Sequence, residues 1–224
     1  MKKIIIMNEY YDILKTVSLF GQISDTDIKS ALLCLGAEIR TVPKNGIILR
    51  TGEKPVHVGI VLTGKLHIVK DDYDGNRTLI AAAAPGEIFA EALCCAGVEE
   101  SPISVLADED AKVLLLRFDN ILHTCPEACP YHQKLIENML KLVANKNLYL
   151  QNRMEIISMK SIRMKFLRYL ETFVQKQGKE IIIPFNREEL ADHLCVERSA
   201  LSHELMKMKR EGLLDYRKNK FILT

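Results

Sequence analysis

The chain has 224 residues, 48% of them hydrophobic, with a formal net charge of +2. This length suits one large or two modest domains with real cores, and no apolar run reaches the length of a membrane span, so no membrane partner is expected. The six scattered cysteines fit a reduced, cytoplasmic protein better than a disulfide framework. The start of the chain lacks a small-residue cleavage site, so we expect no signal peptide.

Charge is distributed unevenly along the chain. Residues 158–224 contain 14 Lys+Arg and 9 Asp+Glu, a surplus of +5, whereas residues 1–157 contain 17 and 20, a balance of −3. A basic C-terminal third beside an acidic N-terminal part is typical of a DNA-contacting domain attached to a sensing domain. A surplus of this size also occurs on inert surfaces.

The N-terminal half combines a capped helix with many short strands. Ser24 begins a helix that we expect to run to about Leu35. From Ala37 to about Phe118, short runs of β-forming residues alternate with glycine or acidic turns, which predicts an antiparallel β-roll. The runs are Glu38–Val42, Ile47–Arg50, His57–Leu62, Lys65–Lys70, Thr78–Ala83, Ile103–Ala107 and Lys112–Phe118.

Residues 131–157 predict a single long helix with two stripes of side chains, the first of them apolar over its first half. One stripe comprises Leu135, Met139, Leu142, Lys146, Tyr149 and Arg153, and the other comprises Ile136, Leu140, Val143, Leu150, Met154 and Ile157. Two stripes allow one side to pack on the roll while the other meets a second copy of the chain. The alternative is a helix buried within its own chain.

The C-terminal part predicts two helices joined by a tight corner. A hinge at Ser158–Lys160, an amphipathic helix over Ser161–Lys176 and a short strand at 181–183 precede it. Asn186 and Glu189 have the spacing of a capping box. Leu190, Ala191 and Leu194 form an apolar face before the corner at 195–197. Gly212 ends the second helix, since glycine readily takes the left-handed conformation there.

The second of these helices has a polar outward face. Ala200, Leu201, Leu205 and Met208 point inward, and the outward residues are Arg198, Ser199, Ser202, His203, Met206 and Lys207. This arrangement predicts a helix-turn-helix whose second helix enters the major groove, where Arg198 can bond guanine O6 and N7. A basic β-hairpin tip at Lys218 could contact phosphate. An ordinary helical hairpin with a solvated face is the alternative.

A β-roll, a long helix and a winged helix in this order resemble the Crp/Fnr family of bacterial transcription regulators. The resemblance covers nearly the whole chain and is closest from Arg187 to Leu205. It implies an α+β fold with a cyclic-nucleotide-binding or cupin-like roll at 1–130, a dimerisation helix at 131–157 and a winged helix-turn-helix at 158–224. It also implies a homodimer on double-stranded DNA, and it leaves RNA polymerase as a possible partner.

The resemblance further implies roles for individual residues. Arg198, Ser199, Ser202 and His203 stand where relatives read bases, and Asn186 and Arg187 stand near phosphates. Lys207 and Lys218 are further candidate DNA contacts. His203 replaces the arginine of many relatives, and a neutral imidazole offers one donor and no fixed charge.

The effector site departs from the pattern of cyclic-nucleotide-binding relatives. Glu91 preserves the ribose-binding glutamate, but Ser101 and Pro102 replace the Arg-Ser pair that binds the cyclic phosphate. Without that arginine the phosphate loses its bidentate partner, so we hypothesise an effector other than cyclic AMP, or a redox signal. Candidate residues for this unknown effector are Glu91, Cys94, Cys95, Ser101 and Tyr149.

Cysteine and histidine pairs define the remaining candidate sites. His123, Cys125, Cys129 and His132 are a weak metal-site candidate, because thiolate and imidazole bind zinc but a buried junction explains them better. No cofactor can be assigned. A cupin-like metal-binding protein or enzyme is the contrasting function, but His57 and His67 are isolated and no catalytic set is visible, so we do not expect an enzyme.

Overall fold

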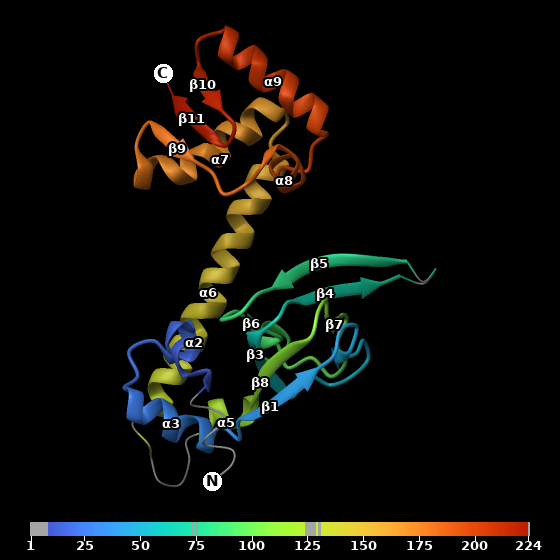
Figure 1. Cartoon of the computed structure of the whole chain (residues 1–224), viewed down its shortest axis with the longest axis vertical. Helices are drawn as coiled ribbons and strands as arrows, with labels where there is room; N and C mark the ends of the chain where they lie inside the picture. The colour runs from blue at the N-terminus through green and yellow to red at the C-terminus, as the bar shows by residue number, and fades with distance from the viewer. Residues whose placement is uncertain (1–8, 73, 75, 124–128, 130, 224) are drawn as a thin grey trace. The chain divides into compact units, whose positions relative to one another are not determined.

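The computed structural model describes residues 9–72, 74, 76–123, 129 and 131–223 of the chain (Figure 1). The chain divides into two compact units, Met1–Asn145 and Lys146–Thr224, with the boundary inside one long helix, α6 (Tyr131–Ser158). None of the helices in this described part is long and apolar enough to cross a membrane.

The first unit contains two four-stranded antiparallel sheets. One has the order β1 (Glu38–Val42), β8 (Ala111–Arg117), β3 (His57–Thr63) and β6 (Ile88–Phe89). The other has the order β2 (Ile47–Leu49), β7 (Ser104–Ala107), β4 (Leu66–Asp71) and β5 (Arg77–Ala83). The seven expected strands are all observed, which confirms the predicted β-roll. The two-residue strand β6 was not predicted.

The side chains of β8 alternate between two hydrophobic cores, one on each face of the first sheet. Val113 and Leu115 pack with residues of the other sheet inside the roll, whereas Leu114 and Leu116 pack against helices on the outer face. Successive strand residues point to opposite faces, so a strand buried on both sides reads as a continuous apolar run. Inside the roll the Phe89 ring covers Gly59, where an added Cβ would lie 2.0 Å from it.

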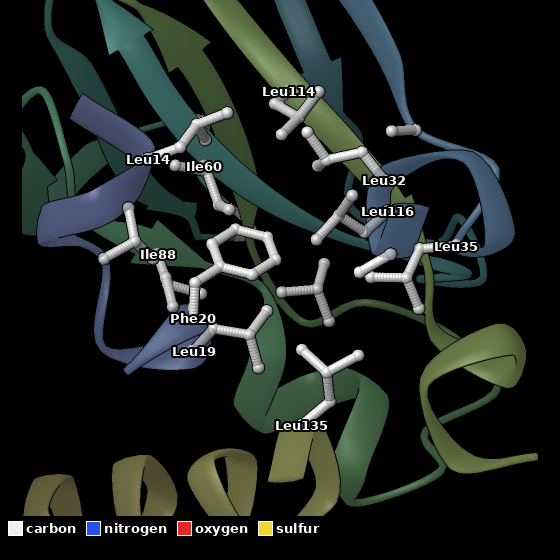
Figure 2. Packing of buried hydrophobic residues seen from close by; sticks show 14 of the residues in the cluster. Leu14, Leu19, Phe20, Leu32, Leu35, Ile60, Ile88, Leu114, Leu116 and Leu135 are labelled. Carbon is white, nitrogen blue, oxygen red and sulfur yellow. The ribbon is translucent and has the colours of Figure 1, made fainter. Parts of the chain in front are cut away.

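Helices cover the outer face of the first sheet. They are α2 (Tyr11–Thr16), the 3-10 helix η1 (Ser18–Phe20), α3 (Asp25–Cys34), α5 (Phe118–Leu122) and the first half of α6. The Ser24 side chain accepts a hydrogen bond from the Asp27 amide, which confirms the expected N-cap of α3. Figure 2 shows Phe20 among leucines of the sheet and helices, with Leu135 of α6 in the same cluster. This core fixes the N-terminal half of α6 on the roll.

The second unit contains the predicted winged helix-turn-helix. Its elements after α6 are α7 (Ile162–Gln177), β9 (Glu180–Ile182), α8 (Arg187–His193), α9 (Arg198–Arg210), β10 (Leu214–Arg217) and β11 (Lys220–Leu223). The strands form one antiparallel sheet in the order β10, β11, β9. Phe166 of α7 and Phe221 of β11 are fully buried with ring centroids 5.1 Å apart, so α7 packs on the sheet.

Candidate nucleic-acid interface and effector cavity

Helix α8 begins with the predicted capping box. The Asn186 Oδ1 accepts hydrogen bonds from the Glu188 and Glu189 amides at 2.9 and 3.0 Å. In return, the Asn186 amide donates to Glu189 Oε2 at 2.8 Å. Helix termini leave backbone amides without intrahelical partners, so this reciprocal pair fixes where α8 starts. The Asn186 side chain is therefore committed to the cap.

The corner between α8 and α9 is closed by backbone hydrogen bonds. The Cys195 amide donates to Asp192 O at 3.1 Å, and the Val196 amide donates to Ala191 O at 3.0 Å. Cys195 has a φ of 51°, the left-handed conformation that such a helix end requires. Ala191 is buried at the crossing. These bonds set the direction in which α9 leaves the corner.

Helix α9 has one buried and one exposed face, as predicted. Leu201, Leu205 and Met208 are fully buried, and Ala200 is half-buried. On the other face Arg198, Ser199, His203 and Lys207 are exposed and Ser202 is half-buried. In the described part of the chain, none of these five side chains has a hydrogen bond or ion pair to another residue. Their donors are available to an external partner.

An ion-pair network that sequence reasoning missed holds α9 against α7. Arg163 Nε donates to Glu204 Oε1 at 2.6 Å, and Arg163 Nη1 donates to Glu211 Oε2 at 2.7 Å. Arg163 also holds the pKa of Glu211 below its usual range through hydrogen bonding. The spacing of 41 and 48 residues gives no local sequence signal. The network fixes both the middle and the end of the recognition helix.

The wing is joined to α8 through Arg187. Its guanidinium carbon lies 5.1 Å from the Tyr216 ring centroid and 5.5 Å from that of Phe221. Its Nη2 donates to the carbonyl of Lys218, an exposed residue at the tip between β10 and β11. Arg187 is half-buried, and burial lowers its pKa. It therefore positions the wing, and its contact with phosphate stays a prediction.

Two residues expected at the effector site lie in the interior of the first unit. Glu91 begins α4 (Glu91–Cys95) and is 3% exposed, and Ser101 is 2% exposed. The Ser101 hydroxyl donates to Ile103 O at 2.7 Å, and its amide donates to Glu53 O at 2.8 Å. Ser101, which we expect at the arginine position of cyclic-nucleotide-binding relatives, is thus a small, internally bonded side chain.

The vicinal cysteines have different surroundings. Cys94 is buried, and its Sγ donates to Pro55 O at 3.4 Å, whereas Cys95 is exposed. Burial raises the pKa of Cys94 to about 12, and burial also raises the pKa of Cys95. The reactive form of cysteine is the thiolate, so these shifts disfavour redox sensing here. The remaining effector candidate, Tyr149, belongs to the second unit and is exposed.

The first unit has a cavity of about 180 Å³ that is lined by residues of both sheets. Arg40, Leu49, His57, Phe89 and Leu115 are among its lining residues. Burial lowers the pKa of His57, and the positive charges of Arg117 and Arg40 lower it further. None of the five residues proposed from sequence lines this cavity.

The candidate metal ligands do not form a common site in the described residues. His123 is exposed, with its Nδ1 2.9 Å from Asp119 O. His132 is buried, with its Nε2 3.8 Å from Cys34 Sγ, and Cys129 is half-buried. Cys125 lies outside the described residues. Within those described, no three His, Cys, Asp or Glu side chains could share a metal ion.

The histidines of the contrasting cupin-like function are also separated. His57 lies in β3 of one sheet and His67 lies in β4 of the other, where its Nε2 is 3.5 Å from Asp108.

A β-roll followed by a winged helix-turn-helix with an exposed polar recognition helix defines a DNA-binding transcription regulator with a sensor domain. The model of the cyclic nucleotide-binding domain matches residues 39–127, and the model of the Crp-like helix-turn-helix domain matches residues 164–224. The chain belongs to the Crp/Fnr family. This family consists of transcription regulators rather than enzymes, and its members typically bind DNA as homodimers.

Solved structures share this fold at low sequence identity. CprK complexed with OCPA is 18% identical with a TM-score of 0.63, and the match covers 88% of each chain. The c-di-GMP responsive global regulator CLP of Xanthomonas campestris is 14% identical with a TM-score of 0.55, covering 88% of this chain and 98% of that one. The catabolite activator protein of Thermus thermophilus is 20% identical with a TM-score of 0.50, covering 92% and 93%. No curated protein sequence matches significantly.

Proposed function

We propose that the chain acts in the cytoplasm as a homodimer that reads two DNA half-sites with its paired α9 helices. Arg198, Ser199, Ser202 and His203 contact base edges. Lys207, Lys218, Asn186 and Arg187 lie along the phosphates, Asn186 through the helix start that it caps. The observation that carries this proposal is the outward face of α9, whose side chains are exposed and lack internal partners.

Exposed apolar residues along α6 support the dimer. Leu140, Leu150 and Met154, from the stripe that contains Ile136, are 70%, 55% and 65% exposed. Leu135 and Met139, from the other stripe, are at most 3% exposed. Large exposed apolar side chains in a row mark interaction surfaces. A parallel pairing of two such helices would bury this stripe and define the two-fold axis of the DNA complex.

A signal received in the roll would change the hinge at Ser158–Lys160 and so the separation of the two recognition helices. The internally bonded Ser101 supports an effector other than cyclic AMP. Micromolar binding of cyclic AMP in calorimetry would contradict this part of the proposal. RNA polymerase would be the further partner if the regulator activates transcription.

Selection of duplexes from a random library tests DNA reading. We expect enrichment of a two-fold symmetric sequence whose half-site centres are roughly 34–36 Å apart, one helical turn. Binding to the selected duplex should weaken steeply with added salt, because phosphate contacts release counterions. Light scattering should give the mass of a dimer. A library that yields no enriched sequence, or protein that stays monomeric with DNA, would overturn the proposal.

A further inference from the structure

The second unit contains a hollow of about 290 Å³ that the DNA-reading function does not use. We call it the aromatic hollow; Arg153, Tyr169, Phe173, Phe185 and His193 line it, among other residues. The Tyr169 ring centroid lies 5.1 Å from that of Phe173 and 5.0 Å from that of His193, and the Phe185 and His193 centroids are 4.8 Å apart. The walls come from α6, α7, α8 and the segment that enters α8.

Three polar groups in the aromatic hollow lack internal partners. Across the residues that the structure describes, the Tyr169 hydroxyl, the Arg153 guanidinium and the His193 imidazole make no hydrogen bond or ion pair. Tyr169 is 4% exposed as a whole residue, and its hydroxyl oxygen keeps some accessible surface, so it is open to a ligand in the hollow. This arrangement differs from that of the neighbouring Arg163 and Arg168, whose guanidinium groups are bound by carboxylates.

The protonation states of these three groups determine which charges and hydrogen-bond donors a ligand would meet. Burial, followed by the neighbouring Tyr149, raises the pKa of Tyr169 to about 12, so its hydroxyl remains a donor at neutral pH. Burial, followed by the charge of Arg153, lowers the pKa of His193, which favours the neutral imidazole. Arg153 is then the one fixed charge among the residues that line the aromatic hollow. A single positive charge beside aromatic walls suits a ligand with one negative group and a flat apolar body.

We propose that the aromatic hollow binds a small carboxylate with a single aromatic ring. The carboxylate accepts two hydrogen bonds from the Arg153 guanidinium, a geometry that matches the planar fork of arginine. The ring packs against Phe173 and Phe185 by edge and offset contacts. The Tyr169 hydroxyl donates to the ligand's polar edge. The volume accommodates one substituted ring but not a nucleotide.

This binding site is independent of the proposed dimer surface. Tyr149, Arg153 and Ile156 follow one another at four and three residues and form a helical stripe separate from Leu150, Met154 and Ile157. A bound ligand would touch the C-terminal half of α6, the middle of α7, and both Phe185 before α8 and His193 at its end. It would therefore stabilise the packing that holds the helix-turn-helix in place.

Isothermal titration calorimetry of the full-length protein tests the proposal with three probes: sodium benzoate, benzamide and sodium butyrate. We expect submillimolar binding of benzoate, and much weaker binding of benzamide, which lacks the charge, and of butyrate, which lacks the ring. Arg153→Gln should weaken benzoate binding roughly tenfold or more, since it removes a charged hydrogen-bond partner. The control Arg77→Gln, in the first unit, should leave it unchanged.

A second variant locates the ligand's ring. Phe173→Ala should weaken benzoate binding while the protein keeps its far-ultraviolet circular dichroism spectrum. Benzoate should also raise the melting temperature of the wild type but not that of Arg153→Gln. Absence of benzoate binding, or binding that Arg153→Gln and Phe173→Ala both leave intact, would overturn the proposal. Neither result bears on DNA reading by α9, because these residues lie outside its polar face.

Discussion

The outward face of α9 and the region of Glu91 and Ser101 are both positions where the family pattern predicts ligand contacts, yet they differ in how their polar groups are used. On α9, Arg198 and His203 are exposed and have no internal partner in the described residues. In the roll, Ser101 is 2% exposed and bonded to Ile103 and Glu53. The α9 side chains keep their hydrogen-bond donors available to an external partner. The buried Ser101 uses its donors in hydrogen bonds that stabilise the fold.

The largest expected effect comes from breaking the core beneath α9. Phe166→Ala should cost about 3–5 kcal/mol, because it leaves a cavity beside Phe221. Urea denaturation should show this loss, and DNA binding should disappear with it. The control Met206→Ala, on the exposed face of α9, should change stability by less than about 0.5 kcal/mol. Equal losses in both variants would show that α9 does not pack as described.

Introducing the family's phosphate-binding pair tests the region of Glu91 and Ser101. The double variant Ser101→Arg and Pro102→Ser should cost roughly 1–3 kcal/mol by overpacking, and it should not gain cyclic AMP binding in calorimetry. Ser101 is 2% exposed, so a guanidinium at this position would have to displace buried neighbours. Glu100→Arg, at an exposed neighbouring position, is the matched control and should be near neutral. Micromolar cyclic AMP binding by the double variant would refute this account.

Removal of the α8 N-cap should lower the stability of the second unit moderately. Asn186→Ala loses the hydrogen bonds to the Glu188 and Glu189 amides and should cost about 1 kcal/mol. Asn186→Asp, which keeps an acceptor, should retain most of the stability. Thermal denaturation measures both. If Asn186→Asp lost as much stability as Asn186→Ala, the cap would act through something other than its acceptor oxygen.

The smallest expected effect concerns the Arg163 network, which lies near the surface. Because Arg163 lowers the pKa of Glu211, the carboxylate stabilises the fold at neutral pH, and this contribution is lost as the pH falls through the lowered pKa. Glu211→Gln should therefore be less stable than wild type at pH 7, and the difference should vanish toward the acid end of a denaturation series. A difference that grows on acidification would contradict the assigned sign.

Local patterns predicted most of the fold, and long-range contacts account for what they missed. The capping box at Asn186 and the alternating runs of the roll are short-range signals, and each leads to the observed element. Strand β6 and helices α4 and α5 are two to five residues long, too short for periodicity to show. The Arg163 network and the aromatic hollow join segments dozens of residues apart, so no window of sequence could reveal them.

The most direct measurement is the affinity of Arg198→Ala for the selected duplex and for random duplex, by fluorescence anisotropy at one salt concentration. The account predicts that the variant loses its preference for the selected sequence, at a cost of roughly 1–3 kcal/mol per half-site, while weak, salt-sensitive binding to random DNA remains. An equal loss on both duplexes would place Arg198 on the phosphate backbone. Unchanged preference would contradict the claim that α9 reads the bases.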